Sequence, residues 1–480
     1  MGDHSEHTIA LIGGGLANTS TLFEFLKIAK AATERPKVSI RIMDVREDFF
    51  GTGPAYNTND AGLTLNSNFA TAFKDTEIGR YFLRWLIQSK EYWLEYLKKL
   101  DDPSVNAWLK SNEYNISIDE YEPIYMLRSV VGLFLKDFLK MLIDRADELG
   151  IKVDLIEGKV NDLEPLEGKK YKCLFAEGKC RKVILSAEQG GKPSFEEISA
   201  DSIIADKLVI SSGLNKNKEF EKVEGKPSYY RTHTNNIAQI VRDVRDRYDG
   251  ENKVDLILLG AKSSYIDVIR TLWHNGLADM VRVHVVSRSG RIPLVETEAQ
   301  RVLARFRVVT PETTVFDVPQ DYADAVKGME IRAYEGEVRS GYVSYSEGKG
   351  FEVMTKDGPV IKGSVLVNVS GPSNNSEANG LIDNLAKRRL APYTNLNEES
   401  VLFVTRRREL VSGAIYAAGA LLQHVSVGGH KRMSPPSIVQ TIVDSIQVAD
   451  ELARGITGLP PIERPSPPSQ TSGPPKETLR

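Results

Sequence analysis

Two stretches of the chain repeat one order of elements: an apolar strand, a glycine turn and an amphipathic helix. The first has apolar residues at 9–12 and glycines from Gly13 onward. The second has apolar residues at 256–259, followed by Gly260. This order is typical of the nucleotide-binding half of a Rossmann fold. The pattern therefore predicts an α/β protein with two Rossmann-like dinucleotide-binding domains.

The first glycine turn supplies a candidate phosphate site. Gly13 permits a tight turn, and Gly15 lets the backbone approach a pyrophosphate, which then binds the N–H groups at the start of the helix, at Leu16 and Ala17. Asn18 stands where a third glycine is usual. We therefore expect either a wider spacing between helix and strand or a bond from Asn18 to the turn. The alternative is a structural turn without a ligand.

An acidic residue closes the second predicted strand. The strand alternates apolar and polar residues over 38–43, and Asp44 follows it, 29 residues beyond Gly15. A carboxylate at this point of a Rossmann unit commonly binds ribose hydroxyls, usually about 20 residues beyond the turn. The longer gap predicts a longer first helix or loop. A solvated carboxylate without a ligand is the alternative interpretation.

Helical spacing of apolar residues dominates positions 77–150, which also hold three of the four tryptophans. The pattern predicts a helical insertion whose apolar stripes form core, with a substrate pocket as the alternative. Short strands are expected over 153–210 and again over 330–369, where the last strand is predicted from Val360 to Val369.

The second Rossmann unit departs from the usual glycine fingerprint. Only Gly260 of its glycines is present, and we expect Ser263 and Ser264 to cap the following helix and to offer hydroxyls to a phosphate. Its second strand, 281–286, is followed by Arg288 within a Ser-Arg-Ser run instead of an acidic residue. An arginine there can pair with the 2′-phosphate of NADP, which favours NADPH over NADH.

Composition excludes several classes of protein. A chain of 480 residues predicts at least two domains, and its net charge of −3 argues against general nucleic-acid binding. No apolar run approaches the roughly 20 residues of a membrane span, and no signal peptide is evident, so a cytoplasmic location is expected.

The two cysteines, Cys173 and Cys180, are expected on neighbouring hairpin strands and do not form a CxxC pair. A dithiol centre is therefore not expected, and no metal site is predicted.

Three further motifs carry a resemblance to a known family. They are Gly-Thr-Gly-Pro-Ala-Tyr at 51–56, Leu-Thr-Leu-Asn at 63–66, and Tyr-Phe-Leu-Arg-Trp-Leu at 81–86. Together with the opening turn they resemble a widespread bacterial group of FAD/NAD(P)-binding oxidoreductases. The resemblance implies that Tyr56 and Asn66 lie near the isoalloxazine or the pyrophosphate, with Arg128 on the flavin side. The alternative places Tyr56 in the core.

The same resemblance implies how the chain is divided. Ser-Ser-Gly at 211–213 resembles a second flavoprotein signature, and Gly419 lies in a closing strand motif that approaches the flavin. The implied fold class is α/β, with the second Rossmann-like domain inserted in the first, plus the helical insertion. The expected division is an FAD-binding domain at 1–215 with its insertion at about 77–150, an NAD(P)-binding domain at 216–365, the rest of the FAD-binding domain at 366–458, and a disordered tail at 459–480.

The implied function is that of an FAD-dependent oxidoreductase using NADPH. The pair His233-Thr234 resembles a His-Ser pair of flavin-dependent N-hydroxylating monooxygenases, which implies a monooxygenase acting on a small amine. A flavin-dependent dehydrogenase or reductase without oxygen insertion is one alternative, and a non-catalytic nucleotide-binding or partner-binding protein is another. The expected partner is a small-molecule substrate, with neither nucleic acid nor membrane; a homo-oligomer stays open. The sequence identifies no catalytic residue.

Overall fold

A computed structural model of the chain gives the fold. It describes residues 7–57, 60–73, 75–115, 117–176, 180–186, 191–198, 202–213, 220–288, 290, 292–293, 319–336, 338, 342–355, 358–370, 380–391, 393–396, 399–405, 407–411, 413–422, 425–427, 430–431 and 437–457. The predicted disordered tail at 459–480 lies outside these residues. In the described part of the chain, no helix is long and apolar enough to cross a membrane.

An eight-stranded sheet forms the first lobe, in the order β20-β21-β9-β1-β2-β3-β6-β7. Its strands are β1 (His7–Ile12), β2 (Val38–Asp44), β3 (Lys152–Glu157), β6 (Cys180–Ile184), β7 (Ser194–Ile198), β9 (Lys207–Ile210), β20 (Glu409–Val411) and β21 (Ile415–Ala417). The five central strands from β21 to β3 are parallel. The sheet thus joins the first 210 residues with strands from near the end of the chain.

A second, five-stranded parallel sheet lies between these two parts in the sequence, in the order β10-β17-β11-β12-β13. Its strands are β10 (Tyr229–Tyr230), β11 (Val254–Leu259), β12 (Val281–Ser287), β13 (Glu330–Glu335) and β17 (Val365–Asn368). The predicted fold class is confirmed: two Rossmann-like sheets, the second inserted in the first. Because β17 pairs with β11, the second lobe extends past the predicted boundary at residue 365. The division into domains otherwise stays a proposal.

One predicted strand is wrong. The run expected from Val360 to Val369 forms two strands, β16 (Val360–Gly363) and β17, which belong to different sheets. The chain changes sheets at Ser364, whose N–H donates to the carbonyl oxygen of Asp255 at 2.9 Å. Strand β16 pairs instead with β15 (Gly350–Met354), which also pairs with β14 (Val343–Ser346).

Two small sheets flank the first lobe. They are β4-β5-β8, with β4 (Val160–Leu166), β5 (Lys170–Phe175) and β8 (Ser202–Ala205), and β18-β19-β22-β23, with β18 (Tyr393–Leu396), β19 (Glu399–Val404), β22 (Val425–Val427) and β23 (His430–Lys431). The expectation that Cys173 and Cys180 lie on neighbouring strands is wrong, since Cys173 is on β5 and Cys180 on β6, in separate sheets. Both cysteines are buried thiols.

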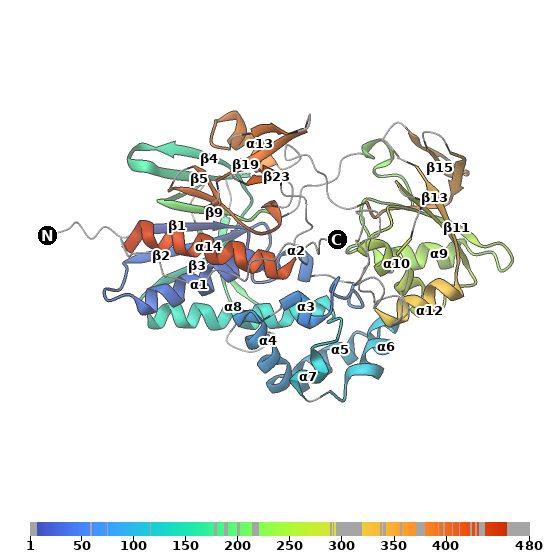
Figure 1. The fold of residues 1–480 in the computed structure, drawn as a ribbon, viewed down its shortest axis with the longest axis horizontal. Helices are drawn as coiled ribbons and strands as arrows, with labels where there is room; N and C mark the ends of the chain where they lie inside the picture. Colours follow the sequence, from blue (N-terminus) through green and yellow to red (C-terminus); the bar gives the residue numbers. More distant parts are fainter. Residues whose placement is uncertain are drawn as a thin grey trace, which may run out of the picture.

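Helices cover both sheets, and a helical segment lies below them (Figure 1). In the first lobe they are α1 (Leu16–Ala31), α2 (Gly53–Tyr56), α8 (Arg128–Glu148), α13 (Gly380–Lys387) and α14 (Ile438–Thr457); in the second they are α9 (Ile237–Arg247), α10 (Ser263–His274) and α12 (Gln320–Gly328). The helical segment holds α3 (Phe69–Phe73), α4 (Glu77–Gln88), α5 (Lys90–Lys99), α6 (Pro103–Asn112) and α7 (Ile118–Tyr121). Helix α8 also contacts α1 and β3, so it belongs to the layer that covers the sheet.

Local sequence explains where the segment's helices begin. Thr76 accepts the Gly79 N–H at the start of α4, and Asp102 accepts the N–H groups of Ser104 and Val105 at the start of α6. Such caps satisfy backbone donors that the helix itself leaves unpaired. The predicted helical character of residues 77–150 is confirmed.

A cluster of aromatic rings joins α4 to α8. Phe82 and Phe134 stack with ring centroids 4.5 Å apart, and Trp85 and Phe138 pack around them. Phe82 and Phe134 are both buried. The apolar stripes of this region are therefore core, as expected.

We expect Phe134→Ala to lower the free energy of unfolding by about 3–5 kcal/mol, because it removes a buried ring and leaves a cavity. Chemical denaturation followed by tryptophan fluorescence measures the loss. Tyr114→Ala is the control, since Tyr114 is 80% exposed and should change stability by less than about 0.5 kcal/mol. Equal effects of the two substitutions would contradict the assignment of this cluster as core.

Candidate functional site

Four loops meet where parallel strands of the first sheet end. Strands β1, β2, β9 and β21 run in the same direction, so the residues that follow them gather at one edge of the sheet. These residues include Gly13, Asp44, Ser211 and Gly419. Strand β1 lies between β2 and β9, and a crevice at such a point of an open parallel sheet is the usual place for a nucleotide.

The opening turn approaches its neighbours closely at two glycines. Gly13 has a φ of +101°, and a Cβ built on it would lie 2.2 Å from the carbonyl oxygen of Ser211. A Cβ on Gly15 would lie 3.3 Å from the Cα of Gly53. No side chain caps α1, whose N-cap residue is Gly15. Gly13 and Gly15 thus form a cradle without side chains of their own, at a helix N-terminus suited to a pyrophosphate.

Asn18 secures the turn in the place of the third glycine. Its side-chain amide donates to the carbonyl oxygens of Ile12 at 3.2 Å and Gly13 at 2.7 Å. The predicted bond from Asn18 to the turn is therefore confirmed. The same region of α1 is tied to α14, because the Ser445 hydroxyl donates to the carbonyl oxygen of Ala17 at 2.8 Å.

Asp44 lies against the turn at the end of β2. Its Oδ2 accepts the N–H of Gly14, and its Oδ1 accepts the N–H of Val45 at 2.6 Å. Burial raises the pKa of Asp44 to about 6, although the two backbone hydrogen bonds oppose this rise. The remaining lone pairs of the ionised carboxylate can accept ribose hydroxyls. The long gap before Asp44 is explained by the 16-residue helix α1 and the loop that follows it.

Two other predicted residues lie around the cradle. Tyr56 ends α2, and burial raises the pKa of its phenol to about 12, so the group is neutral at pH 7. A Cβ on Gly132 would lie 2.3 Å from the carbonyl oxygen of Tyr56, which shows how closely α2 approaches α8. Gly419 has a φ of +68°, and a Cβ there would lie 2.7 Å from the Cβ of Ala17. Close approach at Gly419 is therefore observed, while contact with a cofactor stays a prediction.

Arg128 and Asn66 lie together, and Arg128 is directed toward the second lobe. Arg128 is the first residue of α8; its Nε donates to the Thr64 carbonyl at 2.9 Å, and its Nη2 donates to Asn66 Oδ1 at 3.0 Å and Asp267 Oδ2 at 3.2 Å. Asp267 lies on α10 and also contacts His233 Nε2 at 3.1 Å. Sequence reasoning did not anticipate this group, because its members are far apart in the chain.

The second sheet has a similar but less complete glycine turn. Gly260 follows β11 with a φ of +115°, and a Cβ there would lie 2.7 Å from the carbonyl oxygen of Val369. The predicted serine cap is wrong: α10 begins at Ser263, its N-cap residue is Lys262, and no side chain caps it. Ser263 and Ser264 are instead half-buried residues of the first turn. They still lie where a phosphate would meet the helix N-terminus.

Arg288 stands just past the end of the neighbouring strand. The Gly260 N–H donates to the carbonyl oxygen of Val286 at 2.8 Å, which places the end of β12 beside the turn. The Arg288 side chain is exposed. Its position fits a contact with the 2′-phosphate, which stays a prediction.

Comparisons with known proteins agree with the first crevice. Residues 10–187 match the model of a family described as FAD-NAD(P)-binding. This part of the chain is therefore an FAD-NAD(P)-binding domain, as the resemblance predicted. An uncharacterized protein of Mycobacterium tuberculosis is 23% identical over 297 residues, which cover 59% of this chain and 52% of that protein. The chain thus spans about half the length of the curated relatives it matches.

Two solved structures have a similar overall arrangement. DfoA, the cadaverine monooxygenase of Erwinia amylovora solved with FAD, is 13% identical with a TM-score of 0.52, over 98% of this chain and 99% of DfoA. The ornithine hydroxylase PvdA of Pseudomonas aeruginosa is 13% identical with a TM-score of 0.49, over 94% of this chain and 99% of PvdA. At this identity the likeness to DfoA concerns the fold alone.

We expect Gly13→Ala to abolish flavin binding, because the methyl group would overlap the Ser211 carbonyl at a backbone angle that alanine rarely adopts. Flavin absorbance per mole of purified protein measures the effect. Gly150→Ala is the control, since Gly150 also has a positive φ but no atom lies within 4 Å of its Cβ position. Full flavin content in Gly13→Ala would contradict the cradle.

We expect flavin affinity to fall as the pH drops below about 6, because protonation of Asp44 removes an acceptor for the ribose. The loss should reach at most about tenfold by pH 5, and Asp44→Asn should bind flavin more weakly with no such dependence. The pKa of Asp44 is higher in the folded protein than in the unfolded chain. The contribution of Asp44 to the free energy of unfolding therefore falls as the pH rises from about 4 to 6. Fluorescence titrations with FAD from pH 5 to pH 8 measure the pH dependence of flavin affinity. A wild-type affinity as independent of pH as that of Asp44→Asn would contradict the role of Asp44.

Proposed function

We propose that this chain is an FAD-dependent oxidoreductase that takes a hydride from NADPH. The observation that carries the proposal is the pair of glycine turns, at Gly13 and Gly260, each at the carboxyl end of a central parallel strand. The match of residues 10–187 to an FAD-NAD(P)-binding family supports FAD in the first crevice. NADPH at the second glycine turn rests on Arg288.

Each group of residues has a separate task in this proposal. The backbone from Gly13 to Ala17 holds the pyrophosphate, and Asp44 orients the ribose. Ser263, Ser264 and the start of α10 bind the phosphates of the second nucleotide. FAD held there would supply the redox chemistry, with the nicotinamide as the hydride donor. The protein contributes position and exclusion of water.

A monooxygenase acting on a small amine is the more specific form of the proposal. The likeness of fold to DfoA over nearly the whole chain supports it. The two cysteines argue against a disulfide reductase, because Cys173 and Cys180 lie on separate sheets, and burial raises the pKa of Cys173 to about 12. A dehydrogenase or reductase without oxygen insertion has the same scaffold and is the second candidate.

Colour and anaerobic reduction test the proposal. Purified protein should be yellow, and NADPH should bleach its flavin absorbance under argon. Readmission of air with a panel of small diamines and amino acids should then consume oxygen in proportion to hydroxylated amine. Bleaching without amine hydroxylation would support the dehydrogenase. Colourless protein that gains no flavin on incubation would overturn the enzyme and favour a binding protein.

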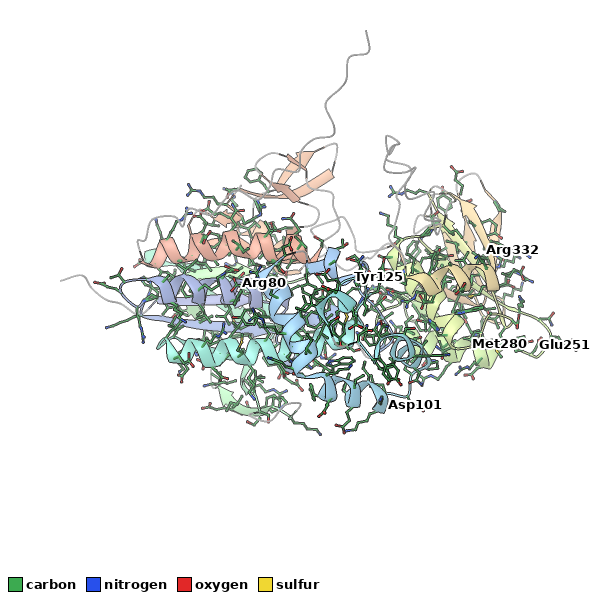
Figure 2. All side chains as sticks on the ribbon, turned by 60° about the horizontal axis from the view of Figure 1, so that its bottom comes forward. Arg80, Asp101, Tyr125, Glu251, Met280 and Arg332 are labelled. Carbon is green, nitrogen blue, oxygen red and sulfur yellow. The ribbon has the colours of Figure 1, made fainter. Side chains whose placement is uncertain are left out.

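We expect Arg288→Ala to raise the dissociation constant for NADPH by about tenfold, because it removes a charge-assisted contact with the 2′-phosphate. The constant for NADH should change little. Arg332→Ala is the control, since Arg332 is an exposed arginine on β13 of the same sheet (Figure 2). Titration of flavin reduction against each nucleotide gives both constants. Equal losses for NADPH and NADH would contradict the phosphate contact.

A further inference from the structure

The residues 60–66, here called the bridging segment, lie between the two lobes. The segment is anchored in the first lobe by backbone bonds: the Leu65 N–H donates to the Met126 carbonyl at 2.8 Å, and the Arg128 N–H donates to the Leu63 carbonyl at 2.8 Å. Figure 2 shows Tyr125, next to this ladder, in the region between the lobes, where side chains are dense. From this anchor three side chains of the segment reach the second lobe.

Asp60 caps a helix of the other lobe. Its Oδ1 accepts the N–H of Ile237, the first residue of α9, at 3.1 Å. The helix's own N-cap residue, Asn236, makes no capping bond with its side chain. A carboxylate at this position satisfies free donors and interacts favourably with the helix dipole. The cap for α9 therefore comes from a residue 177 positions earlier in the chain.

Leu63 and Thr64 continue the contact. The Leu63 side chain is 1% exposed and belongs to the hydrophobic core of the second lobe. The Thr64 hydroxyl accepts from Arg270 Nη1 at 2.9 Å, and the Thr64 carbonyl accepts from Arg128 Nε at 2.9 Å. Gly62 makes this path possible, because a Cβ there would lie 2.4 Å from the Cβ of Ser104 at the start of α6.

Asp267, on α10 of the second lobe, completes the contact between the two lobes. It is 5% exposed, and its Oδ2 contacts both Arg128 of the first lobe and His233 of the second. A buried carboxylate that loses such a partner is left uncompensated, so the pair resists separation. Asp267 also lies about one helical turn beyond Ser263, at the end of α10 proposed to receive the nucleotide phosphates.

We propose that Asp267 and the bridging segment form an interlobe clamp, and that Asp267 is a positioning residue for hydride transfer. The clamp fixes the second lobe, and with it the nicotinamide, relative to the crevice that holds FAD. The contacts themselves do not depend on the cofactors. The effect on hydride transfer rests on the proposed function.

The first test uses the full chain without added nucleotide. Hydrogen–deuterium exchange of Asp267→Asn should become about tenfold faster in the bridging segment and in the first turn of α9. Asp444→Asn is the matched control: it breaks a pair of similar burial, with Asp444 1% and Arg408 13% exposed, within the first lobe. Exchange unchanged at residues 60–66 in Asp267→Asn, or raised equally by Asp444→Asn, would overturn the clamp.

The second test separates positioning from nucleotide binding. In anaerobic stopped flow with NADPH, Asp267→Asn should lower the limiting rate of flavin reduction about tenfold, with the NADPH dissociation constant within about threefold of wild type. An unchanged limiting rate, with or without a raised dissociation constant, would overturn the positioning role. If Asp267→Asn does not fold, Arg128→Lys decides the question, because lysine keeps the charge but cannot contact three acceptors with a planar fork. A wild-type flavin that no nucleotide reduces would refute the proposed function, while the exchange data would still decide the clamp.

Discussion

The first lobe depends on backbone meeting backbone at the end of β1. The Gly13 Cα faces the Ser211 carbonyl so closely that a Cβ would overlap it, and a Cβ on Gly15 would lie 3.3 Å from the Gly53 Cα. These contacts bring α1, β9 and the loop at 51–56 to one point, beside the first N–H groups of α1, which lack partners within the helix. A site for a diphosphate follows from this packing, since the same absence of side chains lets a ligand approach.

The second lobe repeats this arrangement with fewer glycines, and its attachment to the first lobe is made of polar contacts and of the buried Leu63 side chain. Arg128, Asp267 and His233 meet in a region with little solvent, and each lobe contributes to the group. Inter-domain surfaces of this kind usually permit relative motion. The buried charges and the apolar Leu63 side chain oppose such motion here, so the lobes have a defined arrangement.

Much of the fold could be predicted from the sequence because it is local. The strand, turn and helix around Gly13 lie between His7 and Ala31, and the periodic stripes of residues 77–150 identify their helices directly. The prediction failed at Val360–Val369, where apolar residues stand on both sides of the turn at which the chain changes sheets, Ser364, since an apolar pattern alone does not reveal a strand's partners. It failed also for Cys173 and Cys180, whose separation in sequence suggested a hairpin that the sheets do not form. The glycine turns of the candidate site could be predicted because local motifs define them, whereas the Asp267 group depends on residues 34 and 139 positions apart and left no local pattern.

The cap that Asp60 places on α9 has a consequence for how this architecture can be recombined. Consider a chimaera that takes its second lobe from this chain and its first lobe from a relative. Without Asp60, its helix α9 would begin with unpaired N–H donors, and without Leu63 the transplanted core would contain a cavity. The unit that can be exchanged between such proteins is therefore discontinuous: it consists of the inserted lobe together with residues 60–66. Recombination at the two chain crossings alone would separate parts that pack against each other.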